Sequence, residues 1–374
     1  MHSSTYTQKD IGKALKKSVN RGIADAIPLK MGKNCIYSKE EIINTVVFSV
    51  SNDNFVEYGS RRLRGSGLNF PSSDDVFYHL GKLDEKNVFS AFMESNTNIL
   101  DNARKYGVLE KRVWCGLDIH KMPWYGKDRG KNVLGMERVR GTNFGHGYAS
   151  IDCVNTNEPF TLGVLPLTQF TTKKDIMETL VKDARKQVKI GRLFLDREFF
   201  NEESASTLIR LKIRFVIPAV RNKRVDRIIR DAQFNSEKIP NSDCFASITD
   251  YAVKKGGQMS VKLAVILEPT EKGWNEFAFI TNLGVSLENV LELAESYRSR
   301  WGIETGYRVK ENVRGKTCSR KYPVRLFLQL LSVLLYNLWH LCNLILSIRI
   351  RWKSRKYPII LDEFKDIISD SILG

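Results

Sequence analysis

Hydrophobic positions recur at helical spacing over the first third of the chain, up to about residue 110. Ser38 and Glu41 form a capping box that begins a helix with the sequence EEIINTVVFSV. Residues 71–75, PSSDD, begin a second helix that continues as VFYHL. Between them, residues 59–67 form a basic, glycine-rich stretch that is expected to be a loop able to touch phosphates. The pattern predicts a helical DNA-binding or assembly domain over residues 1–110, or a helical bundle with a solvated basic loop.

The pattern changes after residue 111 to short apolar runs of strand length, separated by polar turns. Thr172 and Asp175 cap a helix whose apolar residues recur every fourth position. The expected order is three strands, then this helix, then strand, helix and strand, at residues 113–119, 147–154, 160–166, 172–188, 192–195, 202–211 and 214–217. This order predicts an α/β fold, with antiparallel strands followed by parallel crossovers in one mixed sheet.

The strand and helix alternation breaks between residues 221 and 282. This stretch is rich in strand-forming residues and carries a turn at Gly256–Gly257, which predicts a β-rich insertion. Residues 286–312 then have the pattern of one long helix. The predicted division is therefore a core in two parts, 111–220 and 283–348, around the insertion at 221–282, with a basic segment over 349–374.

Residues 326–348 are apolar over a length that could span a bilayer. Their polar members recur at steps of three and four and form a stripe along one side of a helix: Gln329, Ser332, Tyr336, His340, Asn343 and Ser347. A single spanning helix would expose this stripe to lipid, whereas a buried helix can direct it at solvent or at another domain. We therefore predict a buried helix in a soluble protein that does not bind a membrane.

Composition adds a strong positive charge to this outline. The 374 residues include 59 Lys and Arg against 42 Asp and Glu, a net charge of +17. Such a field attracts polyanions, of which nucleic acid is the commonest, although many basic proteins have no such partner. The six cysteines contain no Cys-x-x-Cys pair, which argues against a zinc ribbon and a secreted disulfide scaffold and favours a reducing compartment.

Two aspartates stand at the ends of predicted strands. Asp118 lies in CGLDIHK and Asp196 in RLFLDREFF. Open α/β sheets build their sites beyond the carboxyl ends of strands, and this topology can place the two strands side by side. Either aspartate alone could simply cap the turn that follows its strand.

A third carboxylate is predicted on the long helix, in YRSRWGIETGYRVKE. Tyr297, Arg300 and Glu304 are three and four residues apart and are expected to share one face. A carboxylate beside an aromatic ring and a guanidinium is suited to holding a metal ion next to a phosphodiester. The alternative is an amphipathic helix with intrahelical ion pairs.

These motifs together resemble the DDE transposases of bacterial and archaeal insertion sequences, in the branch with a Tyr-Arg-Glu-Lys signature. The resemblance covers most of the chain. It implies a ribonuclease-H-like core in which Asp118, Asp196 and Glu304 bind two Mg²⁺ or Mn²⁺ ions. It further implies cleavage at transposon ends and strand transfer into target DNA, with double-stranded DNA and a second copy of the chain as partners, in the cytoplasm at the chromosome.

One position departs from this signature. The family places Lys seven residues after the Glu, but this sequence has Glu311 there and Lys310 one residue earlier. On a regular helix, position 310 is turned about 120° away from Glu304. Either the helix has loosened at Lys310, or Arg308 holds the phosphate instead. Glu311 could also replace Glu304 as a ligand, although only Glu304 keeps the spacing to Tyr297 and Arg300.

Several basic stretches are candidates for contacts with the DNA backbone. Besides Tyr297, Arg300, Arg308 and Lys310, they comprise Arg61, Arg62, Arg64, Arg221, Lys223, Arg224 and the groups at 314–321 and 349–356. Contacts with phosphates carry no base sequence, so none of these residues identifies the terminal repeat. Two further readings remain open: a transposase-derived DNA-binding protein that no longer cuts, and a metal-dependent nuclease with the same core.

Overall fold

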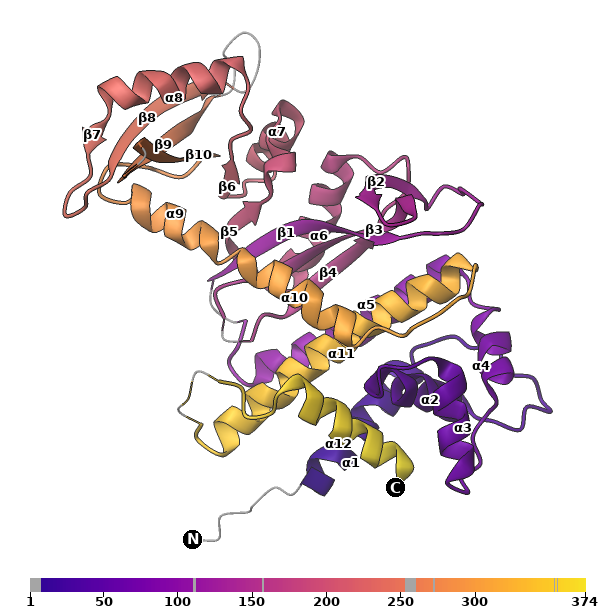
Figure 1. The fold of residues 1–374 in the computed structure, drawn as a ribbon. Coiled ribbons are helices and arrows are strands. Elements are labelled where there is room, and N and C mark those ends of the chain that lie inside the picture. Colours follow the sequence, from indigo (N-terminus) through magenta and orange to yellow (C-terminus); the bar gives the residue numbers. More distant parts are fainter. Residues whose placement is uncertain are drawn as a thin grey trace.

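The computed structural model describes residues 8–109, 112–156, 158–252, 260–271, 273–352, 354 and 356–374. The N-terminal part is helical, and its helices gather at one end of the molecule (Figure 1). They are α1 (Gln8–Val19), which continues into a π-helical turn (Asn20–Ala24), α2 (Lys39–Ser51), α3 (Val56–Gly65), α4 (Ser73–Leu80) and α5 (Glu85–Lys105). The last helix, α12 (Leu361–Leu373), packs against α1 and α2, so the two ends of the chain share one helical unit.

Local signals in the sequence explain where these helices begin. Ser38 and Ser72 both form complete capping boxes, as predicted for the first and consistent with the PSSDD start of the second. The expected loop at residues 59–67 is wrong for its first part, because α3 extends to Gly65. Gly59 lies in this helix where a Cβ would come 2.0 Å from the Ser49 hydroxyl oxygen, so the glycine permits close packing of α3 on α2.

The predicted mixed α/β sheet is present. Its core strands are β1 (Arg112–Pro123), β2 (Leu134–Val139), β3 (Thr142–Cys153), β4 (Thr161–Pro166), β5 (Lys189–Leu195) and β6 (Phe215–Pro218). Strand β3 pairs antiparallel with β1, β2 and β4, whereas β1, β5 and β6 run parallel through the crossover helices α6 (Lys173–Gln187) and α7 (Glu202–Arg210). Of these six core strands, β2 is the one that the sequence analysis did not predict.

Helices cover both faces of this sheet. A Cβ at Gly116 of β1 would lie 2.0 Å from Ile303, which belongs to α10 (Trp301–Asn312). On the other face, Gly163 of β4 lies against Leu180 of α6. The register pairs Gly163 with Ile151 and Ile151 with Leu117. The Leu117 side chain points to the face opposite the one that a Cβ at its neighbour Gly116 would occupy. Helices α6 and α10 therefore pack on opposite faces.

The segment predicted as a β-rich insertion forms the lobe at the upper left of Figure 1. It contains α8 (Lys223–Asn235), β7 (Glu237–Lys238), β8 (Phe245–Ala252), β9 (Ser260–Thr270) and β10 (Gly273–Thr281). Strand β10 pairs antiparallel with β6, so the insertion extends the core sheet in the order β6-β10-β9-β8-β7. The turn predicted at Gly256–Gly257 lies outside the described residues.

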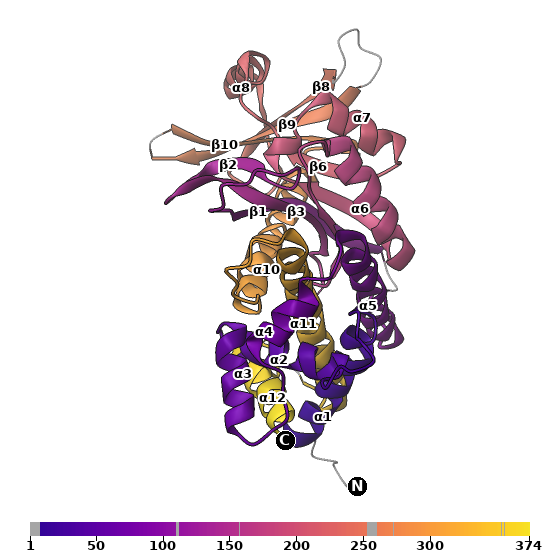
Figure 2. The same cartoon turned by 90° about the vertical axis from the view of Figure 1, so that its right-hand side faces the viewer.

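The apolar segment at 326–348 belongs to α11 (Tyr322–Arg349), which runs along α5 (Figure 2). Among the described residues it is the one helix that is long and apolar enough to span a membrane, and 83% of its apolar window is buried inside the protein. Its polar stripe faces protein. Asn343 exchanges two hydrogen bonds with the backbone of Ile359, and Asn337 accepts from the backbone N–H of Thr161 at 2.9 Å.

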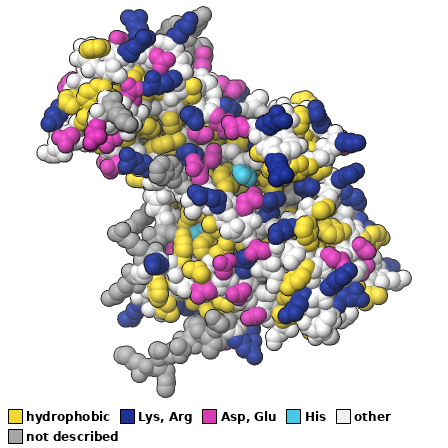
Figure 3. All heavy atoms as spheres, in the orientation of Figure 1, with side chains coloured by type: hydrophobic (Ala, Val, Ile, Leu, Met, Phe, Trp, Pro, Cys, Tyr) yellow, Lys and Arg dark blue, Asp and Glu magenta, His cyan; other side chains and the backbone are white. Residues whose placement is uncertain are grey.

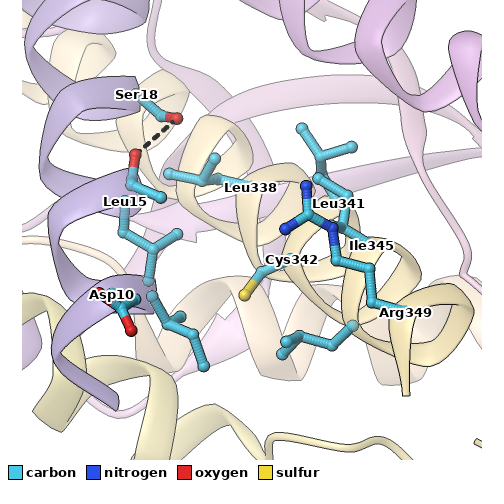
Figure 4. A pocket seen from close by; sticks show the side chains of 11 residues that line it. Asp10, Leu15, Ser18, Leu338, Leu341, Cys342, Ile345 and Arg349 are labelled. Atoms are coloured by element: carbon cyan, nitrogen blue, oxygen red, sulfur yellow. Dashed lines mark hydrogen bonds between the residues drawn. The ribbon is translucent and has the colours of Figure 1, made fainter. Parts of the chain in front are cut away.

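A small apolar cavity of about 160 Å³ remains between α1 and α11. Figure 4 shows Leu15 of α1 facing Leu338 and Leu341 of α11 across it, with Cys342 between the two helices. Packing between these helices is therefore incomplete on this side.

Candidate active site

Asp118 and Asp196 stand at the same edge of the sheet on adjacent parallel strands. The register pairs Leu117 of β1 with Leu195 of β5, so both aspartates follow paired residues. Asp196 ends its strand and caps a short 3₁₀ helix (Arg197–Phe199), accepting a hydrogen bond from the Arg197 N–H at 2.7 Å. The two strands thus bring together carboxylates that are far apart in the chain, as the sequence predicted.

The single long helix predicted over 286–312 is two helices, α9 (Val290–Arg298) and α10. Between them the hydrogen bonds span three residues instead of four: Arg300 N–H bonds to the Tyr297 carbonyl and Ile303 N–H to the Arg300 carbonyl. This tighter turn changes the angle between successive side chains. Tyr297 and Glu304 therefore do not share the straight face expected of a regular helix.

Arg300 links two of the three predicted acids. Its Nη1 lies 3.5 Å from Oδ2 of Asp118, and its Nη2 donates to Oε1 of Glu304 at 2.8 Å. The Arg300 side chain is 9% exposed, whereas that of Glu304 is 48% exposed. Burial opposes the charge on Arg300, but Tyr297 and the three acids, Asp196 included, outweigh it and raise the pKa of Arg300. One guanidinium thus partly neutralises the acidic cluster.

Asp118 has the most perturbed carboxyl group of the site. Burial raises its pKa to about 6, against the attraction of Arg300, and the negative charges of Asp196 and Glu198 add to the rise. Glu198 is a neighbouring acid that the sequence analysis missed. Its pKa is also raised, first by loss of contact with water and further by Asp196. Its position two residues after Asp196 was the signal that could have identified it.

Tyr297 was predicted to contact DNA, but it is buried. Its hydroxyl donates to the carbonyl of Leu195 at 3.2 Å, and its ring packs edge-on against Phe194. Burial, the largest effect, raises the pKa of Tyr297 to about 12. This residue therefore supports the end of the strand that precedes Asp196, and in this structure it presents no surface to a DNA strand.

Lys310, also predicted at the DNA surface, lies in the core at 2% exposure. Its Nζ lies 2.8 Å from Oδ1 of the equally buried Asp152 on β3. Asp152 also accepts from the Ser150 hydroxyl, whose oxygen lies 2.9 Å from the Tyr307 hydroxyl oxygen. Tyr307 in turn donates to the backbone carbonyl of Asp118 at 3.1 Å. A buried polar network therefore connects Lys310 to the strand that carries Asp118.

Of the remaining alternatives at this position, Glu311 is held by protein partners. His120 lies 3.3 Å from its Oε1, and Arg314 donates to its Oε2 at 2.7 Å. Burial would raise the pKa of Glu311, but these partners outweigh it and lower it. Arg308 is exposed on α10, four residues after Glu304. The structure thus leaves Arg308, and not Lys310, accessible to a ligand.

The other predicted DNA contacts fall into groups on separate parts of the surface, on α3 and around the insertion (Figure 1). Arg61, Arg62 and Arg64 are exposed on α3, where Arg61 pairs with a glutamate, Glu57, one turn earlier. Around the insertion, Arg221 pairs with Asp226 and Glu276, Arg224 donates to the Ala252 carbonyl, and Lys223 is exposed. Figure 3 shows Lys and Arg spread over this face with acidic side chains between them. Residues 353 and 355 of the last basic group lie outside the described residues.

The donors at the site are of the right kind for a hard divalent cation, because they are carboxylate oxygens. Within the described part of the chain, no three His, Cys, Asp or Glu side chains are already grouped to hold one ion. Glu304 is paired with Arg300, whose buried Nε has no hydrogen-bond partner among the described atoms. Asp118 and Asp196 are therefore candidate carboxylate ligands on adjacent strands, and Asp118 also lies 3.5 Å from Nη1 of Arg300.

A family model described as "Transposase DDE domain" matches residues 124–338. This span is more than half of the chain. The chain belongs to the DDE transposase family. Asp196 and Glu304 lie within the matched residues, and Asp118 lies just before them. No curated protein matches the sequence of this transposase.

Family membership agrees with the architecture. The mixed sheet with helices on both faces is consistent with the ribonuclease-H-like core of a DDE transposase. Transposases act on DNA and form a class of DNA-cleaving enzymes, so the substrate of this family accounts for the positive charge of the chain.

Proposed function

We propose that this DDE transposase mobilises an insertion sequence, in the branch with the Tyr-Arg-Glu-Lys signature. It would cleave DNA at the ends of the element and join the freed 3′ ends to target DNA. The observation that carries the proposal is the pairing of Leu117 with Leu195, which sets Asp118 and Asp196 side by side at one sheet edge. Arg300 and Glu304 approach the same edge from the helix above.

In this proposal Asp118, Asp196 and Glu304 hold two Mg²⁺ or Mn²⁺ ions. When bound, such ions activate the attacking water or hydroxyl and stabilise the leaving oxygen of an in-line displacement. Arg300 holds Oε1 of Glu304, so a ligand role for that oxygen would require release of Arg300, whereas Oε2 is not bonded to the guanidinium. The 48% exposure of the Glu304 side chain leaves room for either arrangement. Glu198 interacts electrostatically with Asp118 and Asp196 and is a candidate for a further carboxylate ligand.

The protein's own groups would prepare this chemistry. Tyr297 and Tyr307 bond to backbone carbonyls at Leu195 and Asp118 and so fix the ends of the two strands. Arg300 limits repulsion among the acids before the ligand arrives. Once released from Glu304, its guanidinium is placed to bond to a phosphate oxygen, for which its planar donor geometry is well suited.

Contacts along the DNA backbone are assigned to exposed cations. Arg308 lies nearest to the acids in sequence, on the same helix as Glu304. Arg61, Arg62 and Arg64 on α3, with Lys223 at the insertion, would hold more distant parts of the duplex. Two transposon ends would be brought together by two copies of the chain, acting on chromosomal DNA in the cytoplasm.

Strand transfer is the direct test. The full chain is incubated with labelled duplexes that carry the element's ends, a plasmid target and Mg²⁺, beside an Asp196→Asn variant. We expect joined products from the wild type and none from the variant, with equal binding of the end duplex. Cut ends without joining would establish a nuclease instead. Binding without any cutting in Mg²⁺ or Mn²⁺ would leave a DNA-binding protein of transposase descent.

A further inference from the structure

A cationic pocket lies at the edge of the sheet opposite the acids. It has a volume of about 460 Å³, and its floor includes Gly191 of β5. Five basic side chains from separate parts of the chain line it, and no acidic residue is among the described residues that do so: Arg112, Arg185, Lys189, Lys212 and Arg214. This surface is referred to below as the amino-edge pocket.

The topology of the sheet explains why these cations meet. Arg112 begins β1 and Lys189 begins β5, and the parallel register pairs them directly. Arg214 precedes β6, and its backbone carbonyl accepts from the Leu193 N–H at 2.8 Å. Parallel strands bring their first residues to the same edge, so cations spread over about a hundred residues of sequence become neighbours. This arrangement explains why no basic run in the sequence indicated the pocket.

The backbone around the amino-edge pocket is held in place. Arg185, at the end of α6, donates from its Nη2 to the Leu211 carbonyl at 2.5 Å. Lys212 occupies a left-handed turn with a φ of 54°, between α7 and β6. None of the five cations forms an ion pair with an acid in the described part of the chain. The pocket therefore presents unbalanced positive charge from a fixed frame, which favours a polyanion.

The pocket and the acids are separated by the body of the sheet. From Arg112 to Asp118, β1 rises by about 20 Å at 3.3 Å per residue. Helices α6 and α10 cover the two faces between these edges. Duplex DNA has a persistence length of about 150 base pairs, so bending a much shorter duplex sharply costs free energy. A separate DNA segment at the opposite edge avoids this cost, because one duplex would have to bend around the sheet to reach both edges.

We infer that the amino-edge pocket binds the phosphate backbone of a DNA segment separate from the one at the acids. The inference rests on the proposed function, because it assumes a protein that handles more than one DNA segment. Contacts with phosphates would hold this second segment without reading its sequence. It extends the proposed function by assigning a second binding surface to each chain.

The salt dependence of DNA binding tests the pocket. A triple variant of the full chain, Arg112→Gln, Lys189→Gln and Arg214→Gln, keeps Arg185, whose side chain bonds to the Leu211 carbonyl, and Lys212 in its left-handed turn. Each phosphate contact contributes about 0.9 to the slope of log affinity against log salt, so this variant should lower the slope by about 2 to 3. A control with the same net charge replaces three exposed lysines outside both the pocket and the predicted N-terminal DNA-binding domain, Lys174, Lys182 and Lys238, with Gln and should change the slope much less.

Stoichiometry tests whether the segment is separate. Each wild-type chain should bind one more ten-base-pair duplex, about 34 Å long, than the triple variant binds, whether or not the chains dimerise. A slope equal to that of the control would overturn the inference. A lower slope with unchanged stoichiometry would also overturn it, because the pocket would then contact the same duplex. An unchanged thermal unfolding midpoint shows that the triple variant is folded. If its midpoint falls, the double variant Lys189→Gln and Arg214→Gln takes its place in the same binding measurements.

The two proposals fail in different ways. Binding is measured here without cleavage, so an inactive chain that still shows the slope change would retain the amino-edge pocket and lose only the transposase chemistry. A wild type that performs strand transfer, but whose triple variant binds DNA like the control, would lose only the pocket.

Discussion

Replacing Lys310 with methionine should destabilise the protein without weakening its contact with DNA. The substitution leaves the Asp152 carboxylate buried and without its ion-pair partner, since both side chains are less than 5% exposed. Breaking a buried pair by removing one partner costs about 3 to 5 kcal/mol. Asp152 keeps hydrogen bonds from the Ser150 and Thr161 hydroxyls, so we expect the lower end, about 3 kcal/mol.

A double-mutant cycle measures this coupling. Urea titrations at pH 7 would give the free energies of unfolding of the wild type, Lys310→Met, Asp152→Asn and the double variant. The double variant buries no charge at this pair, and the amide oxygen that replaces the carboxylate can still accept a hydroxyl hydrogen bond. It should therefore cost less than the sum of the single changes by about 2 kcal/mol. Arg308→Met serves as the matched control, because Arg308 is exposed on the same helix.

The same variants separate a structural role from a role in DNA binding. Arg308→Met should leave stability within about 0.5 kcal/mol of the wild type and lower the salt slope of DNA binding by about 1. Lys310→Met should instead lower stability by about 3 kcal/mol and leave the salt slope of DNA binding unchanged. A cost below about 1 kcal/mol for Lys310→Met, together with a lower salt slope, would refute the buried network and restore Lys310 as a phosphate contact.

Three further measurements follow from the structure. Because burial raises the pKa of Asp118 to about 6, Mn²⁺ binding measured by calorimetry should weaken up to about tenfold per pH unit below 6, and a flat profile from pH 5 to 8 would contradict this. Burial lowers the pKa of His340 to about 3, so below pH 6.5 this histidine is protonated in the unfolded chain before it is protonated in the folded one, and the protein loses stability. In urea titrations, His340→Leu should remove about 2 kcal/mol of the loss in stability between pH 7 and 5. Ala14→Leu should fill the cavity between α1 and α11 and add about 0.5 to 2 kcal/mol in thermal unfolding, and an equal gain from Lys13→Leu, outside the cavity, would argue against filling as the cause.

The sequence was sufficient to predict the strands that carry Asp118 and Asp196. Both are short apolar runs that end in an acid, and the order of strands and helices after Asp118 permits parallel pairing. The third acidic motif was harder to place. Tyr297 and Glu304 are seven residues apart in the sequence whether the backbone between them is a regular helix or a tighter turn with hydrogen bonds to the third residue back. The break before α10 therefore leaves no mark in the pattern of hydrophobic and polar residues.

The burial of Lys310 was beyond prediction for a different reason. Its partner Asp152 is 158 residues away in the chain, on a strand to which the sequence analysis assigned no functional residue. A lysine in a helix next to other charged residues is ordinarily solvated, and the pattern around Lys310 gives no sign of a carboxylate beneath it. Similarly, the glycines at 59, 65 and 67 indicated a loop, because the sequence does not show that α2 packs against Gly59.

The two edges of the parallel strands carry opposite charge, and the cause lies in the topology. Strand β1 begins at Arg112 and carries Asp118 at its middle, directly after the last residue paired with β5, and β5 begins at Lys189 and is followed by Asp196. Since parallel strands align start with start and end with end, each pair of like charges is gathered at one edge. An anionic duplex and the cations that serve its cleavage would meet at the acidic edge, where Arg300 supplies the nearest positive charge. The basic edge attracts phosphates without that competition from acids, so the binding of a DNA segment there would depend on salt and would not require the divalent ion.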